Sequence, residues 1–348
     1  MKPEKQSEIG YYTRTLDGHR QSYLDFVKKK IGGNRVKGFT LVSKKQPLLF
    51  LMIEDNFLLY FMVGCIRAIL GRRTVGLLFR PKPALEASNF RLKLKLRMLK
   101  FFKKIQSVKT LSIVPATLEP AISTIVDDWI YDFQLWDMTP EQKVIFHKIR
   151  KDDINFENFE EYKIANEIKN YAKGKKILIA LGAQNKGKGI HVLSEHIGIF
   201  NQENYIVVVA GRFEEASANQ KNHLQDNQAL VFDRYMTDEE ILALYSVADA
   251  VWCYYDPAYD QASGILGRAV QLGTLPIVRP NSFSEKFCLS EKIVHIAPLV
   301  FSKASLDISL MVGEEGSERA GKSIVNMEEI SKQKLCIALG LDRTRDLA

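Results

Sequence analysis

A glycine-rich stretch in the second half of the chain places two lysines in a turn that could hold a phosphate. Gly182 to Lys188 reads G-A-Q-N-K-G-K and lies between an apolar run and a helical pattern. It matches the first seven positions of the phosphate-binding pattern G-x-x-x-x-G-K-S/T, but Gly189 at the eighth lacks the hydroxyl that binds Mg²⁺. This departure disfavours a nucleotide-hydrolysing site. A phosphate or diphosphate bound beside Lys186 and Lys188 is one interpretation, and a solvated turn is the alternative.

A second turn of small residues has the sequence context of an anion site. Between Thr237 and Val278 the pattern predicts helix, strand, polar loop, helix and strand, and the loop ends at Ser263 and Gly264. In a parallel sheet, such a loop lies at the ligand-binding edge, and the following helix directs its free N–H groups there. The backbone amides of Ser263, Gly264 and Ile265 are therefore candidates to bind an anionic group.

The strand and helix expectations follow the same alternation along the whole chain, which favours parallel sheets. The segment from Thr139 to Lys176 is charged and helical in pattern, without a strand signal, and connects the two halves. The expected strands are 9–12, 38–42, 48–53, 74–79, 110–114, 177–181, 205–210, 229–232, 250–254 and 275–278. The expected helices include 22–30, 57–70, 90–105, 190–200 and one that begins at residue 238.

Four ordered segments resemble the C-terminal domain of GT-B glycosyltransferases in the glycosyl transferases group 1 superfamily. They span Ile177 to Val278 and read L-G-A-Q-N-K-G-K-G-I-H-V-L, V-V-V-A-G-R, F-D-R-Y-M-T-D-E-E-I-L-A-L-Y-S-V-A-D-A and Q-A-S-G-I-L-G-R-A-V-Q-L-G-T-L-P-I-V. The resemblance implies an α/β protein of GT-B architecture, in which two doubly wound Rossmann-like domains face a central cleft. We expect an N-terminal acceptor-side domain over residues 1–160 and a C-terminal nucleotide-sugar-binding domain over 161–320. A helical tail over 321–348 would return to the N-terminal domain.

The resemblance also implies transfer of a sugar from a nucleotide-sugar to a saccharide or lipid-linked acceptor, in surface polysaccharide or glycolipid synthesis. Lys188 would contact the donor diphosphate, and the amides of the Ser263 turn would cap the same group. Fixed cations and a helix dipole suit a leaving diphosphate, and we expect neither a metal site nor a cofactor. The expected donor-binding residues are Gly182, Lys186, Lys188, Gly211, Arg212, Arg234, Asp260, Ser263, Gly264, Ile265 and Arg268.

Two positions depart from the family pattern. Where many members carry a Glu-x7-Glu pair, this chain has Asp260 and Arg268, so the second carboxylate is replaced by a cation. Ala183 and Gln184 stand where an arginine often follows the first glycine. These departures leave open whether the reaction would retain or invert the anomeric configuration. They also motivate the alternative of a non-catalytic GT-B-like scaffold or partner-binding protein.

The first half offers a candidate for acid–base chemistry in the loop Asp17-Gly18-His19-Arg20. Asp17 or His19 could deprotonate an acceptor hydroxyl, because the loop follows the first strand. A turn that caps the following helix would explain Asp17 without any function. Glu54 and Asp55 form a second carboxylate pair after a strand. The remaining histidines share no spacing and are interpreted as structural or solvated.

The basic character of the chain is concentrated in the first half. Thirteen Lys or Arg stand between Arg67 and Lys109 against the single acid Glu86, and the run Arg91–Ile105 contains seven of them. At helical spacing, Lys93, Arg97, Lys100 and Lys104 form one face, and Leu94, Met98, Phe101, Phe102 and Ile105 form another. This pattern suits a helix on an anionic membrane surface. An ordinary surface helix and, from the alternation L-K-L-K-L, a strand are the alternatives. Few aromatic residues interleave the basic ones, which disfavours a nucleic-acid partner.

Length and composition indicate a soluble protein of two domains. The 348 residues are 46% hydrophobic and 26% charged, with a net charge of +8. The four cysteines lack metal or disulfide spacing, and the N-terminus lacks an apolar signal segment. The apolar run from Phe57 to Leu70 is too short to span a bilayer and is interrupted by Arg67. We therefore expect a cytoplasmic protein that is peripheral on the inner face of the membrane.

Overall fold

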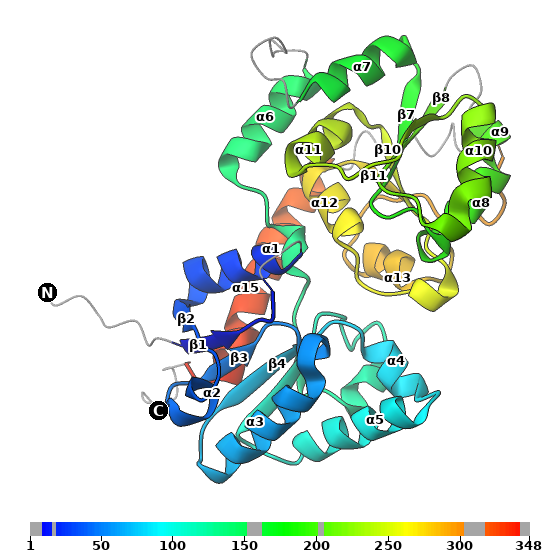
Figure 1. Ribbon diagram of the computed structural model, residues 1–348. Coiled ribbons are helices and arrows are strands. Elements are labelled where there is room, and N and C mark those ends of the chain that lie inside the picture. The colour runs from blue at the N-terminus through cyan, green and yellow to red at the C-terminus, as the bar shows by residue number, and fades with distance from the viewer. Residues whose placement is uncertain (1–8, 16–18, 152–161, 201–204, 303–316, 342–348) are drawn as a thin grey trace, which may run out of the picture. The chain divides into compact units, whose positions relative to one another are not determined.

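The computed structural model describes residues 9–15, 19–151, 162–200, 205–302 and 317–341 (Figure 1). Its contacts divide the chain into two units, Met1–Asp137 with Val325–Ala348, and Met138–Ile324. The domain boundary that we predict at residue 160 lies outside the described residues. Each unit contains one parallel sheet accompanied by helices, which confirms the predicted α/β class.

The sheet of the first unit has six parallel strands in the order β2-β1-β3-β4-β5-β6. The strands are β1 (Ile9–Tyr12), β2 (Gly33–Arg35), β3 (Leu48–Phe50), β4 (Thr74–Leu78), β5 (Val108–Ser112) and β6 (Asp128–Trp129). The α-helices are α1 (His19–Phe26), α2 (Thr40–Ser43), α3 (Phe57–Ile69), α4 (Pro81–Glu86), α5 (Phe90–Phe102) and α15 (Ser317–Leu339). A π-helical segment, Val27–Ile31, continues α1, and short 3₁₀ turns occupy Ile53–Asn56, Pro120–Thr124 and Phe133–Leu135.

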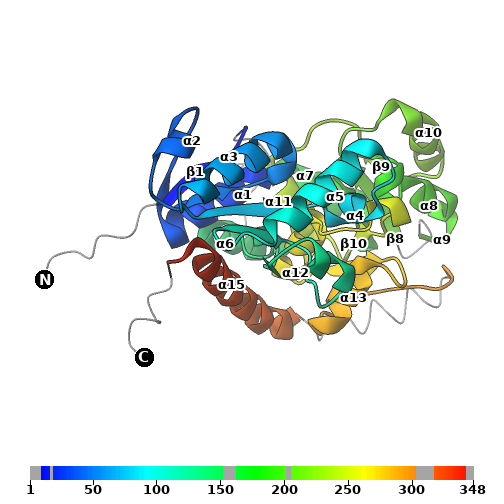
Figure 2. The ribbon, with the colours of Figure 1, turned by 90° about the horizontal axis from the view of Figure 1, so that it is seen from below.

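Helices α3 and α5 lie side by side against this sheet (Figures 1 and 2). The rings of Phe61 and Phe102 stack with centroids 4.9 Å apart. Tyr60 of α3 is fully buried and meets Phe102 edge-on at 5.3 Å. Gly64 permits this approach, because a β-carbon there would lie only 2.6 Å from the Phe102 ring. The helix predicted over residues 57–70 is thus present as α3, and aromatic contacts hold one of its faces against the unit.

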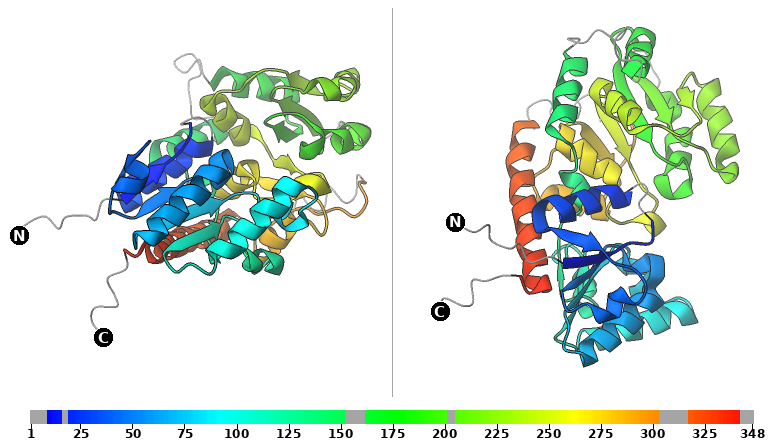
Figure 3. Two further views of the ribbon diagram at one scale, coloured as in Figure 1. Left: turned by 60° about the horizontal axis from the view of Figure 1, so that its bottom comes forward. Right: turned by 60° about the vertical axis from the view of Figure 1, so that its left-hand side comes forward.

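The C-terminal helix α15 packs alongside the sheet of the first unit (Figure 3). The hydroxyl oxygen of buried Ser331 accepts the N–H of Tyr131 at 3.0 Å. Lys334 forms a 2.8 Å ion pair with Asp128, and its ammonium group lies 3.7 Å from the centre of the Trp129 ring. These contacts join the end of the chain to strand β6.

One strand prediction in the first unit is wrong, and the helix predicted from residue 90 is confirmed against its strand alternative. The strand predicted at residues 38–42 is replaced by helix α2, because Gly38 turns the backbone at φ +54° and the Thr40 hydroxyl accepts the N–H of Lys37 at 3.2 Å. The neighbouring strand is instead the polar segment β2. The alternating run at Leu92–Leu96 belongs to helix α5, which Asn89 begins by accepting the N–H of Leu92 at 3.0 Å, so the strand alternative fails.

The sheet of the second unit has five parallel strands in the order β11-β10-β7-β8-β9. The strands are β7 (Lys176–Leu181), β8 (Tyr205–Ala210), β9 (Leu230–Phe232), β10 (Ala250–Cys253) and β11 (Leu275–Val278). The α-helices are α6 (Pro140–Arg150), α7 (Lys163–Ala172), α8 (Ile190–Glu195), α9 (Ile197–Phe200), α10 (Ala218–Asp226), α11 (Asp238–Val247), α12 (Gly264–Leu272) and α13 (Phe283–Ser290). Short 3₁₀ turns occupy Lys186–Lys188, Glu215–Ser217 and Pro257–Tyr259.

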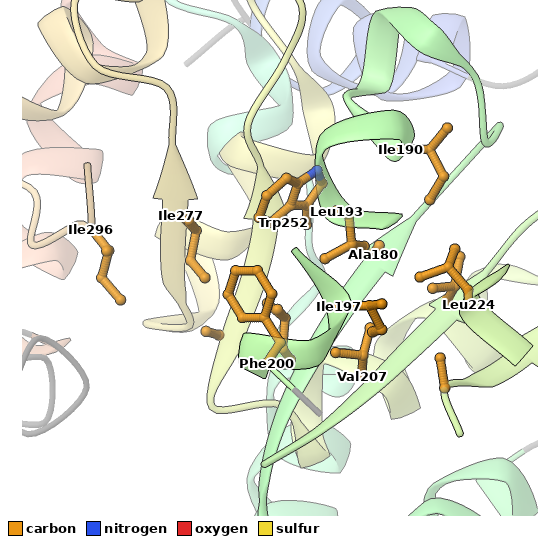
Figure 4. Packing of buried hydrophobic residues seen from close by; sticks show 14 of the residues in the cluster. Ala180, Ile190, Leu193, Ile197, Phe200, Val207, Leu224, Trp252, Ile277 and Ile296 are labelled. Atoms are coloured by element: carbon orange, nitrogen blue, oxygen red, sulfur yellow. The ribbon is translucent and has the colours of Figure 1, made fainter. Parts of the chain in front are cut away.

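One apolar cluster joins this sheet to helices α8, α9 and α10 (Figure 4). Trp252 of β10 is 3% exposed and meets Phe200 of α9 edge-on at 5.7 Å. Leu193, Val207 and Ile277 complete the same contact surface and are buried. Burial of aromatic and branched side chains at this density stabilises the sheet that carries the loops described next.

Candidate nucleotide-sugar site

The sheet of the second unit changes its direction of growth between β7 and β10. Strands β8 and β9 extend it on one side of β7, whereas β10 and β11 extend it on the other. The loop after β7 leads to α8, and the loop after β10 leads to α12 on the opposite face (Figure 1). Ligands of open parallel sheets bind at such a switch point, outside the carboxyl ends of the strands. The two turns singled out in the sequence are these two loops.

Two glycines let the backbone turn where the strands end. Gly182, directly after β7, has φ +86°, and Gly211, directly after β8, has φ +136°. A β-carbon on Gly211 would overlap the carbonyl oxygen of Gly182, so the two loops touch through their main chains. Buried Gln184 donates from Nε2 to the Gly182 carbonyl at 2.8 Å. Gln184, which stands where the family often has an arginine, therefore braces the turn.

The predicted phosphate turn is a short 3₁₀ helix, Lys186–Lys188, with a side-chain cap. The Asn185 carboxamide oxygen accepts the N–H of Lys188 at 3.0 Å, and its Nδ2 donates to Glu214 at 2.6 Å. Gly189 follows at φ +72°, where a β-carbon would overlap the carbonyl oxygen of Tyr254. The carbonyl of Gly187 accepts the N–H of Asp256 at 3.1 Å. The loops after β7 and β10 are thus joined.

The side chain of Lys188 lies against two tyrosine rings from the loop after β10. Its Nζ is 4.5 Å from the centroid of Tyr255 and 5.0 Å from that of Tyr259. The two rings meet edge-to-face at 5.9 Å. A cation over an aromatic face gains about 0.5–2 kcal/mol, depending on its exposure to water. The rings therefore hold a positive charge at the switch point.

Tyr255 connects this lysine to the first turn of α12. The residue is buried, and burial raises the pKa of its hydroxyl well above the usual value. Its hydroxyl lies 2.6 Å from Oγ of Ser263, the residue that precedes α12. The side chain of Ser263 therefore bonds to Tyr255 and does not cap the helix. The side chain of Ile265 on the same turn lies beside Gly182, since a β-carbon there would be 3.3 Å from Ile265 Cδ1.

Asp260, the first carboxylate of the family pair, is engaged by the protein. Its Oδ2 forms a 3.1 Å ion pair with Arg279, and its Oδ1 accepts the N–H of Phe283 at 2.8 Å. Arg279 follows β11 directly and also donates from Nε to the carbonyl of Tyr255 at 2.9 Å. The pair thus fixes the loop that carries Tyr255.

The remaining predicted donor-binding side chains differ in their surroundings. Arg234 forms a 2.5 Å ion pair with Glu240, and this bond raises the pKa of Arg234 and lowers the pKa of Glu240. Arg268 forms a longer contact of 3.5 Å with Asp238. Lys186 and Arg212 are exposed beside the turns that carry them.

The structure describes only some of the residues of the first half that are candidates for acid–base chemistry. Asp17 lies outside the described residues, and His19 is the first residue of α1. Glu54 is half-buried with its Oε2 shielded from water, and its Oε1 accepts the N–H groups of Phe79 and Arg80 at 2.8 and 2.7 Å. Burial raises the pKa of the Glu54 carboxyl, which is opposed by nearby Lys95. Glu54 therefore secures the turn after β4.

Sequence reasoning missed three residues that shape the site, namely Asn185, Tyr259 and Arg279. Arg279 had a usable signal, because a charged residue directly after a buried strand lies at the carboxyl edge of the sheet. The Asn185 cap could have been found from its position before a helical turn. Tyr259 had no such signal, since its contact with Lys188 depends on how the loop after β10 folds.

The predicted apolar face of helix α5 is only partly packed against the unit. Leu99 and Phe102 are buried and attach the helix to the unit, but Leu94 and Phe101 are 41% and 49% exposed. Phe90 at its start is 76% exposed. The lysines and arginine of the predicted basic face are exposed as well. Within the described part of the chain, no helix combines the length and hydropathy needed to cross a bilayer.

The fold is similar to that of several solved structures over most of the chain. One of them is Anabaena Alr3699/HepE in complex with UDP, with a TM-score of 0.61 and 10% sequence identity. The match covers 98% of this chain and 100% of the HepE chain. An α,α-trehalose-phosphate synthase (UDP-forming) from Burkholderia xenovorans is similar over 85% of this chain and 73% of its own, at a TM-score of 0.56 and 9% identity. WaaG, a glycosyltransferase involved in lipopolysaccharide biosynthesis, matches 95% of this chain and 98% of its own, at a TM-score of 0.50 and 13% identity.

These similarities establish the class of fold. The chain has the GT-B architecture that its C-terminal motifs imply, and that fold prediction is confirmed. No protein-family model matches the sequence, and no curated protein matches it. At such low identity the likeness concerns the fold, and function has to be argued from the site.

Proposed function

We propose that the protein is a glycosyltransferase that takes a sugar from a nucleoside-diphosphate sugar. The observation that carries the proposal is the position of Lys188, which two tyrosine rings hold at the switch point beside the first turn of α12. A diphosphate there would meet an ammonium group and a helix N-terminus together. UDP in the HepE complex and the UDP-forming reaction in the name of the trehalose-phosphate synthase support this donor class.

The reaction breaks the bond between the sugar and the diphosphate, so negative charge grows on the leaving group. We assign the stabilisation of that charge to Lys188 and to the N–H groups of Ser263, Gly264 and Ile265, without a metal ion or cofactor. The charge stabilisation would then survive a chelator. The anomeric outcome depends on groups near the reacting carbon, and Asp260 is not free to act there while it pairs with Arg279.

We propose further that the acceptor is lipid-linked and that the enzyme works at the cytoplasmic face of a membrane. Helices α3 and α5 support this, because they combine exposed apolar side chains with basic ones. Ile69 at the end of α3 is 86% exposed, and Phe90 is 76% exposed directly before the run Arg91–Ile105, which contains seven cations. Exposed apolar side chains with basic neighbours suit an anionic bilayer surface. WaaG, which acts in lipopolysaccharide biosynthesis, is a structural neighbour that supports the same acceptor class.

A non-catalytic GT-B scaffold is the second candidate. It is favoured by one observation, that the position of the family's second carboxylate is Arg268, which contacts Asp238. A direct assay of nucleotide release distinguishes the two functions, because only a transferase releases the nucleotide from its sugar donor.

A thermal-shift screen against UDP, GDP, dTDP, ADP and CMP identifies the donor base, since a ligand of the folded state raises its melting temperature. Release of that nucleoside diphosphate from the matching sugar donors is then measured with and without EDTA. We expect release in both conditions, and faster release with a lipid-linked acceptor. Binding without release from any donor would favour the scaffold. Flotation with anionic vesicles tests the membrane part, with Phe90→Ser expected to weaken it and Val144→Ser as the control.

A further inference from the structure

The first unit contains a cavity of about 610 Å³ that the donor site does not use. Its lining residues come from the ends of β1 and β2, from the segment after β2 and from helices α2 and α3. One side is apolar and is formed by Leu41, Val42, Leu59, Met62, Val63 and Ile66. The other side carries Arg14, Arg35 and Lys37. None of the described residues that line it is acidic.

The guanidinium of Arg35 is held in place by the main chain. Its Nη2 donates to the carbonyls of Thr13 and Arg14 at 2.9 and 3.3 Å. Its Nε is shielded from water and has no hydrogen-bond partner among the described residues. The two carbonyls thus hold a positively charged guanidinium at the wall of the cavity. Lys37 is exposed at the rim, so a second cation can close on the same ligand.

The apolar wall continues onto the surface of α3. Met62 and Ile66 line the cavity and are still 48% and 45% exposed. They lie one helical turn apart, and Leu58 and Ile69 extend the stripe with exposures of 57% and 86%. A chain that fills the cavity can therefore leave it along an apolar surface. An inorganic ion would use the cations and leave this wall empty.

We propose that the cavity binds an amphiphile with a phosphate headgroup and a hydrocarbon chain. The phosphate pairs with Arg14, Arg35 and Lys37, and the chain lies on Leu59, Met62 and Ile66. The identification of this ligand as the acceptor's lipid carrier rests on the proposed transferase function. The binding of a phosphate amphiphile to the cavity does not. The same chemistry is found in a prenyl phosphate and in a phosphatidic acid, which the experiment separates.

The test is calorimetric titration of the full-length protein with decyl phosphate below its micelle concentration, and with decanol and inorganic phosphate. Decyl phosphate should bind at least about tenfold more tightly than decanol or inorganic phosphate. Decanol can use only the apolar side of the cavity, and inorganic phosphate can use only the cationic side. Lys37→Gln and Ile66→Glu should each weaken its binding about tenfold. The exposed matched controls Lys45→Gln and Ile337→Glu should leave it unchanged. All four side chains are exposed, so these changes should leave the fold intact.

Equal affinity for inorganic phosphate and decyl phosphate, or indifference to both Lys37→Gln and Ile66→Glu, would overturn the proposal. Competition by farnesyl phosphate supports it with a prenyl carrier as the source, and competition by dihexanoyl phosphatidic acid supports it with a glycerolipid. Nucleoside diphosphate binding is measured in the same samples. If the nucleotide binds and decyl phosphate does not, the cavity assignment fails while the proposed transferase function stands.

Discussion

The ammonium group of Lys188 lies 4.5 Å from the centre of the Tyr255 ring, so a cation from the loop after β7 rests on an aromatic residue from the loop after β10. Each loop thereby fixes the other at the switch point of the sheet. Tyr259 adds a second ring at 5.0 Å from the same nitrogen. The position of the charge thus depends on two rings that can be altered separately.

Replacement of Tyr259 by leucine should weaken nucleoside diphosphate binding about two- to fivefold, because Lys188 loses one of the rings that orient it. Tyr259→Phe keeps the ring and should bind as the unaltered protein does. Titration calorimetry compares the two variants. Equal weakening by leucine and phenylalanine would show that the hydroxyl, and not the ring, matters.

Gly189→Ala should disrupt the junction of the two loops. Gly189 has φ +72°, and a β-carbon would overlap the Tyr254 carbonyl oxygen. We expect a loss of more than about 1 kcal/mol in the free energy of unfolding, together with weaker nucleotide binding. The matched control is Gly198→Ala in α9, where no atom of the described residues outside the local helical segment lies within 4 Å of the added carbon. That change should leave stability unchanged or raise it by up to about 1 kcal/mol. Urea unfolding measures both, and an unaffected Gly189→Ala would contradict the steric argument.

Arg67 should be a major contributor to stability in the first unit. Its buried guanidinium donates to Thr74 Oγ1 and to the carbonyls of Leu41, Lys44, Gln46 and Arg73 at 2.7–3.0 Å. Arg67→Met should cost about 2–4 kcal/mol, because those acceptors would be left buried without donors. Arg97→Met on the exposed side of α5 should stay within about 0.5 kcal/mol. Chemical unfolding of both variants is the measurement, and a loss under 1 kcal/mol at Arg67 would count against this role.

Glu54 should make stability depend on pH. Burial raises its pKa in the folded state above the usual 4.5, so folded protein binds a proton before unfolded protein does. Its contribution is full below pH 4.5 and is lost as pH rises through the folded-state pKa. Glu54→Gln keeps an oxygen for the N–H groups of Phe79 and Arg80 and removes the charge.

Urea unfolding at pH 5 and pH 7 checks this prediction. The unaltered protein should gain stability relative to Glu54→Gln as pH falls. At pH 7 the variant should be at least as stable. A variant that is less stable at pH 7, with an unchanged pH profile, would mean that the electrostatic attraction of Lys95 outweighs the burial of the charge.

The strands of the second unit can be predicted from the sequence better than those of the first, because the composition of each strand marks its ends. The buried strands β7, β8, β10 and β11 are continuous apolar runs that end in glycine or polar residues, so their bounds follow from composition. In the first unit, β2 reads G-N-R and β6 reads D-W, and these short polar strands exist only because neighbouring strands pair with them. The apolar segment at residues 38–42 turns into a helix because of Gly38 and Thr40.

In the candidate site, too, some features follow from the sequence and others depend on tertiary packing. Gly182, Lys188 and Ser263 can be placed at one edge of the sheet from the sequence, because each belongs to a loop that follows a parallel strand. The ion pairs of Asp260 with Arg279 and of Arg234 with Glu240 depend on tertiary packing. The spacing of these residues in the sequence does not reveal them. The rings over Lys188 likewise come from a loop more than sixty residues away in the chain.

The most direct test of the account is the affinity of the selected nucleoside diphosphate for the unaltered protein and for Lys188→Ala, measured by titration calorimetry at low salt. The account predicts that the unaltered protein binds and that Lys188→Ala binds at least about tenfold more weakly, because the diphosphate loses its fixed cation. Lys175→Ala, an exposed lysine before β7, is the control and should bind normally. Equal affinity in all three proteins would contradict the placement of the donor site at the switch point.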